Sequence, residues 1–428
     1  MATRQRFQSH TWSDDPAELR HVANAFTKAS PAALTTTFKL IEKGLASGKG
    51  FLGGSEYVGL AGIAHAYLHL SGSMAQISAS HMASAPEPLQ ALAASHDSLL
   101  SMAAQLANAA STSPRHVTFL QGMPGVLCVR AAIYKAQGKS SEAEAAAMEV
   151  KQWHALATSM PPGECELLYG RAGYLYCVLY LCKHVSPKAA DASMVAKLVQ
   201  QIVSEGQRSP MAAEFGGLMY TWHGSTYLGA AHGLVGIVHT LALAHKQFPG
   251  AVLCPGVDLG GLIRSVTLAL IEHAFPSGNL PSSQGSDTDK LVHWCHGAPG
   301  FLPLLLEVEG LCSSAEAARV HAAAERAADV IWERGLLLKG PGMCHGVSGN
   351  GYALLSVYRH TGDTRYLVRS LHFAEWLTER WQQLYGHADR PMSLFEGISG
   401  AVYFWADALA AAMGGERADH IVFPGYEI

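Results

Sequence analysis

The sequence predicts an all-α protein, an α/α toroid or double-layered α-barrel of seven helical hairpins with about 14 helices. Three observations support this prediction. The motif GxxG recurs seven times, with 48 to 64 residues between successive first glycines. The stretch after each motif has the apolar periodicity of a helix, and no convincing run of strands is present. A lone GxxG carries no information, whereas seven at nearly regular spacing indicate a repeat architecture.

Each repeat predicts one hairpin. The glycines open a mostly apolar helix, as in "GVLCVRAAIYKAQGK" from Gly125, and an amphipathic helix such as "TRYLVRSLHFAEWLTERW" then returns toward the next motif. Helices that are apolar on most faces belong inside, and helices that carry charges belong outside. Neither end of the chain resembles a polar capping repeat, which favours closure over an open solenoid. The first glycines are Gly59, Gly122, Gly170, Gly233, Gly297, Gly346 and Gly397.

Length and pattern predict a single domain over residues 1–428. We expect a short N-terminal extension over about residues 1–30. The small and polar residues of 71–98 indicate a partly flexible insertion that lengthens the first interval between motifs.

Composition narrows the classes of partner and compartment. The formal net charge of −4 offers no basic field for nucleic acid. No apolar run is long enough for a membrane span, and the first residues, "MATRQRFQSHTW", contain no signal peptide. We therefore expect residence in the cytoplasm, with peripheral membrane attachment or a nuclear pool left open, and cysteines that stay reduced.

Alignment of the repeats on their first glycine predicts a metal site. The residues directly before that glycine are Val58, Gln121, Tyr169, His232, His296, His345 and Glu396. Only the fifth and sixth repeats add a cysteine before the histidine, at Cys295 and Cys344. Two cysteines and one histidine suit zinc and leave a fourth position open, as in catalytic sites. The spacing alone does not choose between His296 and His345.

Two further residues are candidates for chemistry. His232, in "GAAHGLVG", has the same register one repeat earlier, at a place suited to proton transfer. Lys339, in "KGPGMCHG", lies five residues before Cys344 and could attract a carboxylate or phosphate. On position alone, a helix-capping role for His232 is equally consistent, and a solvated role for Lys339 is the more common one.

The chain resembles the LanC-like proteins, eukaryotic relatives of the bacterial lantibiotic cyclases, almost from end to end. The resemblance runs through "GLAGIAHAYLHL", "VTFLQGMPG", "ELLYGRAGYLY", "YLGAAHGLVGI", "FPSGNLP", "LVHWCHGAPG", "GMCHGVSGNGYA", "SLFEGISGAVYFWADAL" and "FPGYEI". It implies a toroid of seven inner and seven outer helices with zinc at one mouth. It also implies Cys295, Cys344 and His345 as zinc ligands, which leaves His296 beside the open position.

The same resemblance implies an activity. The family's bacterial members add a peptide cysteine thiolate to a dehydroamino acid, and its eukaryotic members bind glutathione. We therefore predict addition of the glutathione thiolate to dehydroalanine or dehydrobutyrine residues, which form in proteins such as kinases when phosphoserine or phosphothreonine loses phosphate. His232 would carry the proton and Lys339 would hold glutathione or the departing phosphate. The alternative is a zinc- and glutathione-binding scaffold that docks kinases without turnover.

The arginines that the family uses near the site have displaced counterparts here. Arg4 and Arg6 are both candidates for the N-terminal arginine, and neither keeps its spacing to the following phenylalanine. Arg390 stands three residues before Ser393, where the family pattern has its arginine about seven residues before. We expect Arg4, Arg390, His296 and Lys339 to contribute to glutathione binding.

Overall fold

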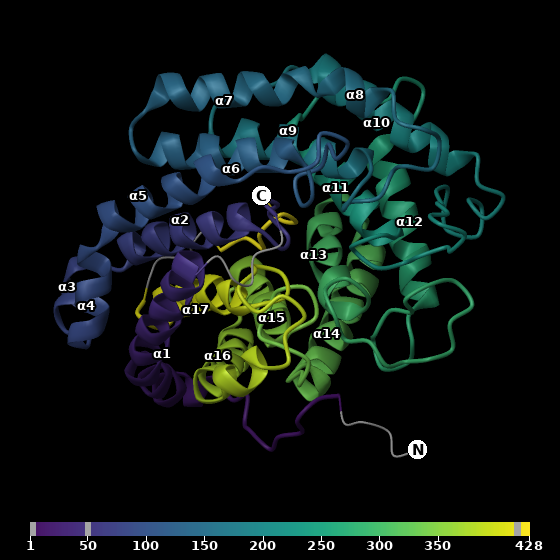
Figure 1. Ribbon diagram of the computed structural model, residues 1–428. Coiled ribbons are helices and arrows are strands. Elements are labelled where there is room, and N and C mark those ends of the chain that lie inside the picture. Colours follow the sequence, from purple (N-terminus) through teal and green to yellow (C-terminus); the bar gives the residue numbers. More distant parts are fainter. Residues whose placement is uncertain (1–5, 48–52, 415–420) are drawn as a thin grey trace. The chain divides into compact units, whose positions relative to one another are not determined.

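The computed structural model describes residues 6–47, 53–414 and 421–428. Over these residues the secondary structure consists of 17 α-helices and two 3₁₀ helices (Figure 1). The only β-pairing in this part of the chain is three isolated bridges. Over the same residues no helix combines the length and hydropathy needed to cross a membrane. The all-α prediction is confirmed.

Seven helices begin directly after the first glycine of a motif, which is the N-cap residue in every case. They are almost wholly buried, as the apolar pattern predicts. These helices are α2 (Leu60–Gln76), α6 (Met123–Ala136), α9 (Arg171–His184), α11 (Leu234–Gln247), α13 (Ala298–Val308), α15 (Val347–Thr361) and α17 (Ile398–Ala412).

Seven further amphipathic helices accompany them, and six of these follow a motif helix in the chain. The seventh, α1, packs against α16 and α17 and so takes the place of a returning helix after the last motif. The set consists of α1 (Leu19–Ser47), α5 (His96–Ala109), α7 (Ser140–Gln152), α10 (Ala192–Gln207), α12 (Leu259–His273), α14 (Ser314–Arg334) and α16 (Thr364–Tyr385). The count of 14 is therefore correct for the repeats. The additional elements are η1 (Pro16–Glu18), α3 (Ala79–Ala83), α4 (Glu87–Ala94), α8 (His154–Thr158) and η2 (Glu309–Leu311).

The second glycine of each motif explains why the motif repeats. A Cβ atom there would lie between 1.7 Å, at Gly125 against the Phe119 carbonyl oxygen, and 2.4 Å, at Gly400 against the Leu394 oxygen. In all seven repeats the obstructing atom is the carbonyl oxygen six residues earlier. The loop before each helix thus folds back onto its first turn, and only glycine permits this approach.

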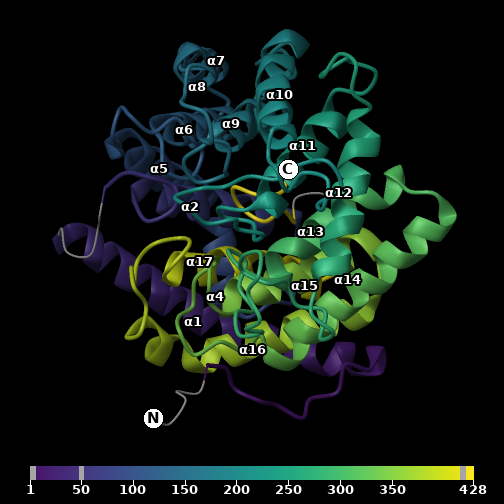
Figure 2. The same cartoon turned by 90° about the vertical axis from the view of Figure 1, so that its right-hand side faces the viewer.

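The described chain forms two compact units. The first comprises Met1–Ala110 and Ile331–Phe423, and within it α17 packs against α2 and α15, with α1 and α16 outside them. The second comprises Ser111–Val330 and Pro424–Ile428, and within it α9 and α11 are neighbours between α6 and α13. Figure 2 shows the helices of each unit from a second direction.

The C-terminal residues belong to the core of the second unit. The Tyr426 hydroxyl donates to the Gly300 carbonyl oxygen at 2.7 Å, and the Tyr176 hydroxyl donates to the Glu427 oxygen at 2.8 Å. Tyr176 and Tyr426 are each 1% exposed, so these bonds satisfy hydroxyls that would otherwise be buried at a cost. The last residues therefore stabilise the start of α13 and the middle of α9.

The chain boundaries expected from the sequence stay predictions, and the structure adds detail to two of them. Within 1–30, helix α1 already begins at Leu19, and Phe7 forms a bridge with Leu337. Within 71–98, the chain contains the end of α2, the short helices α3 and α4 and the start of α5. The predicted flexibility of 71–98 and the prediction of a single domain remain open to test.

We expect Gly125→Ala to lower the free energy of unfolding by about 3 kcal/mol, because the added methyl group meets a backbone carbonyl that has no room to move. Thermal and urea unfolding measure this change. Gly72→Ala is the matched control, since Gly72 lies within α2 and a Cβ there meets nothing within 4 Å. The control should be neutral or stabilising by up to about 1 kcal/mol, through helix propensity. Equal stability of the two variants would contradict the role assigned to the motif.

Candidate functional site

Two histidine-bearing loops lie together in the second unit. The Ala231 amide donates to the Cys295 carbonyl oxygen at 3.4 Å, and a Cβ on Gly229 would lie 2.3 Å from that oxygen. The loop before α11 therefore lies directly against the loop before α13. The rings of His232 and His296 are 6.5 Å apart between centroids as a result. The two histidines that share this register therefore lie near one another in this unit.

The structure adds a carboxylate that the sequence analysis missed. Nδ1 of His232 is 2.9 Å from Oε2 of Glu166, which is 1% exposed. The same carboxylate accepts hydrogen bonds from the Leu168 amide at 2.8 Å and from the Tyr169 amide. The Glu166 carboxylate is therefore fixed by its own loop, and it orients the His232 ring with Nε2 directed away from it.

A repeat-based signal for Glu166 exists four residues before the first glycine. In three other repeats this position is a hydroxyl residue that accepts from a loop amide, at Ser55, Thr118 and Ser393. In the remaining three it is Gly229, His293 and Gly342. Glu166 performs the same local task with a carboxylate that is long enough to reach His232 as well.

A layer of aromatic rings supports His232 on one face. The Trp222 ring stacks on the His232 ring with centroids 4.3 Å apart and planes 7° apart. The Tyr169 ring is nearly parallel to both and lies 6.3 Å from the His232 ring. Tyr227 lies 6.0 Å from His232 and 5.8 Å from His296. Packing on several sides fixes the imidazole of His232 in one orientation.

In the first unit, Asp389 joins two of the residues singled out from the sequence. Its Oδ2 lies 3.2 Å from Nζ of Lys339 and 3.4 Å from Nε2 of His345. Burial by itself would raise the pKa of Asp389, but the hydrogen bond and charge of Lys339, followed by those of His345, hold it below its usual value. Asp389 is thus an anion that positions both a lysine and an imidazole.

Burial and neighbouring charges act in opposite directions on the pKa values of His345 and Glu396. Burial would lower the pKa of His345, but the charge of Cys344 and a hydrogen bond with it outweigh burial and raise the pKa. Burial raises the pKa of Glu396, the charge of His345 opposes this shift, and the charge of Asp389 adds to it.

The Cys344 amide donates to the Phe395 oxygen at 2.7 Å, which holds the loops before α15 and α17 together.

Of the arginines predicted to contribute to glutathione binding, those that the structure describes lie near Asp389 and Lys339, through backbone contacts. Arg390 is exposed, and it donates to the Asp389 carbonyl oxygen at 2.9 Å. Arg4 lies outside the described residues. Arg6 is exposed, and its carbonyl oxygen accepts from the Leu338 amide at 3.0 Å, one residue before Lys339. The backbone of Arg6 is therefore next to the Lys339 loop, although the spacing to Phe7 departs from the family pattern.

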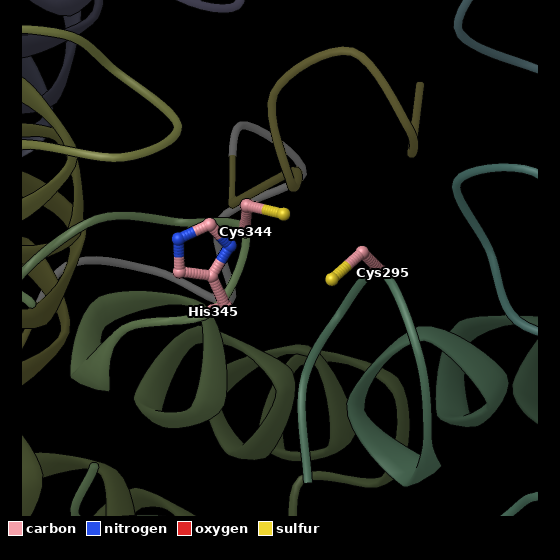
Figure 3. A group of neighbouring side chains, drawn as sticks. All are labelled: Cys295, Cys344 and His345. Atoms are coloured by element: carbon pink, nitrogen blue, oxygen red, sulfur yellow. The ribbon is translucent and has the colours of Figure 1, made fainter. Parts of the chain in front are cut away.

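Cys295, Cys344 and His345 form a cluster with the chemistry of a metal site. One ligand atom of each lies within 4.8 Å of the others. The cysteines are 8% and 2% exposed. In Figure 3 both sulfurs and one edge of the imidazole face a common space. Because Nε2 of His345 faces Asp389, Nδ1 is the ring atom available to a metal, and a carboxylate behind a ligand histidine is a common supporting feature.

Comparison with known proteins gives the family. The family model for "Lanthionine synthetase C-like protein" matches residues 50–412. The chain belongs to this family. It is 34% identical over 384 residues to "Glutathione S-transferase LANCL1" of Danio rerio, covering 87% of this chain and 84% of the relative. It is 32% identical over 337 residues to "LanC-like protein GCL1" of Arabidopsis thaliana, covering 75% and 73% respectively.

A solved structure supports the fold of this lanthionine synthetase C-like protein. "Nisin cyclase" matches with a TM-score of 0.59 at 14% identity, covering 90% of this chain and 98% of that chain. At this identity the match shows the fold alone. The fold class predicted from the sequence, an α/α toroid, is confirmed by it.

We expect the reduced, metal-free protein to bind Co²⁺ through the cysteine cluster, with the near-ultraviolet absorption that thiolate ligation produces. Cys295→Ser and Cys344→Ser should each remove about half of that absorption or more, because each deletes one of two thiolates and weakens metal binding. Cys312→Ser is the control, since the Cys312 thiol donates to the Val308 oxygen and is not part of the cluster. Unchanged absorption in both cluster variants would show that the metal binds elsewhere.

Proposed function

We propose that the protein catalyses a zinc-dependent addition of the glutathione thiolate to dehydroalanine and dehydrobutyrine residues of polypeptides. The observation that carries this proposal is the donor set of two cysteines and one histidine, Cys295, Cys344 and His345. This set fits zinc and leaves one coordination position for a further ligand. The name of the Danio rerio relative, a glutathione S-transferase, supports glutathione as the thiol.

The chemistry assigned to the metal is limited and specific. Zinc, when bound by these three side chains, would keep the glutathione sulfur deprotonated near neutral pH. Both cysteines are buried, at 8% and 2% exposed. Asp389 accepts from Nε2 of His345, which would leave Nδ1 directed toward the metal. The same carboxylate oxygen contacts Nζ of Lys339.

The protein's own residues would complete the reaction with a proton. The sulfur forms a bond to the β-carbon of the dehydroamino acid, and the electron pair of the double bond moves to the α-carbon as an enolate. His232 then delivers a proton from Nε2 to that α-carbon. Glu166 accepts from Nδ1 and stabilises the protonated imidazole before the transfer. The thiol proton lost at the start is thereby balanced by the proton gained at the end.

Glutathione has carboxylates that need positive partners, and several are at hand. Lys339 lies in the loop before Cys344. The carbonyl oxygen of Arg6 accepts a hydrogen bond from the amide of Leu338, the residue before Lys339. Arg390 follows Asp389 directly. His296 lies beside Cys295 and contributes to binding in this proposal. Glutathione, dehydroamino acid polypeptides and kinases as partners, and residence in the cytoplasm, are parts of the same proposal.

We expect purified protein with zinc and glutathione to convert a dehydrobutyrine peptide to its glutathione adduct far faster than the uncatalysed reaction, because the metal-bound sulfur reacts as the thiolate. Mass spectrometry of the peptide measures the adduct, and Cys344→Ser is the inactive control. Removal of zinc with a chelator should abolish the activity, and added zinc should restore it. Glutathione binding without adduct formation would instead support the scaffold alternative.

We expect His232→Asn to lower kcat about 100-fold or more while the affinity for glutathione stays unchanged, because the proton donor is lost and the thiol site is not. Glu166→Gln should also lower kcat, by a smaller factor, since it leaves the imidazole in place without its carboxylate partner. Stopped-assay kinetics and calorimetric titration with glutathione separate the two effects. His321→Asn, at an exposed position, is the control. Normal turnover by His232→Asn would remove the proton-transfer role.

A further inference from the structure

A cavity of about 520 Å³ lies in the second unit, one layer of side chains away from His232. Its walls come from the loops that precede α6, α9 and α11. Six residues define its character, namely Arg115, His116, Glu164, Tyr169, Trp222 and His223. A volume of this size suits a peptide side chain with part of its backbone rather than a single ion.

The wall toward His232 is aromatic. Tyr169 and Trp222 both line the cavity and both stack with the His232 ring. His116 packs edge-on against Tyr169, with ring centroids 5.3 Å apart, and His223 packs edge-on against Trp222 at 4.3 Å. A ligand in the cavity therefore touches the rings that hold the proposed proton carrier.

The backbone at His223 is strained. His223 is the one non-glycine with a positive φ, at 48°, among residues 6–47, 53–414 and 421–428, and Gly224 follows with φ 77°. Trp222 and Ser225 exchange both backbone hydrogen bonds, at 2.9 and 3.0 Å, so this is a tight two-residue turn. Asparagine or glycine suits the first position of such a turn. A histidine there carries a conformational cost, which points to a task for its side chain at the cavity wall.

The charges around the cavity favour an anion. Arg115 is a cation, His116 and His223 offer ring N–H donors, and Glu164 is the one carboxylate among the lining residues. Behind the wall formed by 160–164, the buried guanidinium of Arg171 donates to the carbonyl oxygens of that segment, including Pro161 at 3.1 Å. The Glu205 carboxylate accepts from the Gly163 amide of the same segment at 2.7 Å and balances this buried cation, so the positive charge at the cavity comes from Arg115.

We propose that this cavity binds an anionic side chain of the polypeptide acceptor, next to the residue that reacts at His232. The inference rests on the proposed function, because it assumes a polypeptide whose reacting residue lies at the His232 ring. An extended chain advances about 3.3–3.6 Å per residue, so a neighbour one or two positions away reaches past the aromatic layer. Carboxylate and phosphorylated side chains share the required charge, and the test separates them.

The test compares three dehydrobutyrine peptides that differ at the neighbouring residues, which are glutamine, glutamate or phosphoserine. We expect kcat/KM of the wild type to be about tenfold higher or more for an anionic peptide than for the glutamine peptide, the range of a charge-assisted hydrogen bond. A preference for phosphoserine over glutamate would assign the cavity to phosphorylated acceptors, and the reverse would assign it to acidic ones. Equal kcat/KM for all three peptides would overturn the proposal.

Two variants locate the preference. His223→Asn keeps the turn and removes the imidazole, and Arg115→Gln removes the guanidinium. Each should shrink severalfold the ratio of kcat/KM for the anionic peptide to kcat/KM for the glutamine peptide. Lys188→Gln removes a positive charge at an exposed position that does not line the cavity, and it should leave the preference intact. Circular dichroism and thermal unfolding confirm that each variant is folded. A preference that survives both cavity variants would contradict this location.

Binding without reaction separates this inference from the proposed function. A phosphoserine peptide with threonine in place of dehydrobutyrine cannot form an adduct, and fluorescence anisotropy measures its affinity. Charge-dependent binding that weakens in Arg115→Gln and His223→Asn supports the cavity even if no adduct ever forms. Adduct formation together with charge-independent binding and kinetics supports the function and rejects the cavity.

Discussion

The arrangement of this protein depends on the close approach of each motif loop to the helix that it starts. In every repeat a carbonyl oxygen six residues before the second glycine occupies the space where a Cβ would be. In each repeat the contact brings the residue before the first glycine to the beginning of a buried helix. Side chains at this register share one end of the helices within each unit. Three of the 22 histidines of the chain, His232, His296 and His345, stand at this register.

The proposed catalytic groups use the same loop contacts for a second purpose. Glu166 accepts from two amides of its own loop, as hydroxyl residues do in other repeats, and its carboxylate also reaches Nδ1 of His232. Asp389 similarly follows a helix end and holds both Lys339 and His345. Because the Glu166 carboxylate is fixed by its own loop, the His232 imidazole that it contacts is held in place as well.

The cavity beside His232 shares two of its lining residues with the packing around the imidazole. The rings of Tyr169 and Trp222 are shared between the imidazole and the cavity, so a bound acceptor and the proton carrier would rest against the same surfaces. The strained turn at His223 belongs to this wall. Strain of this kind persists only where the surrounding structure maintains it, and here two backbone hydrogen bonds of the turn do so.

The amino-acid pattern was sufficient to predict the repeat, the all-helical class and the residues next to the first glycines, among them Cys295, Cys344, His345 and His232. These features are local: helical periodicity and a glycine that must lie under a carbonyl leave a mark on consecutive residues. The repeat register marks the position of Glu166, but the contact of Glu166 with His232, the contacts of Asp389 and the aromatic wall depend on the tertiary structure. Glu166 is 66 residues from His232 in the sequence, and Asp389 is 44 residues from His345. Which side chains meet across such separations depends on how the loops pack, which no short pattern encodes.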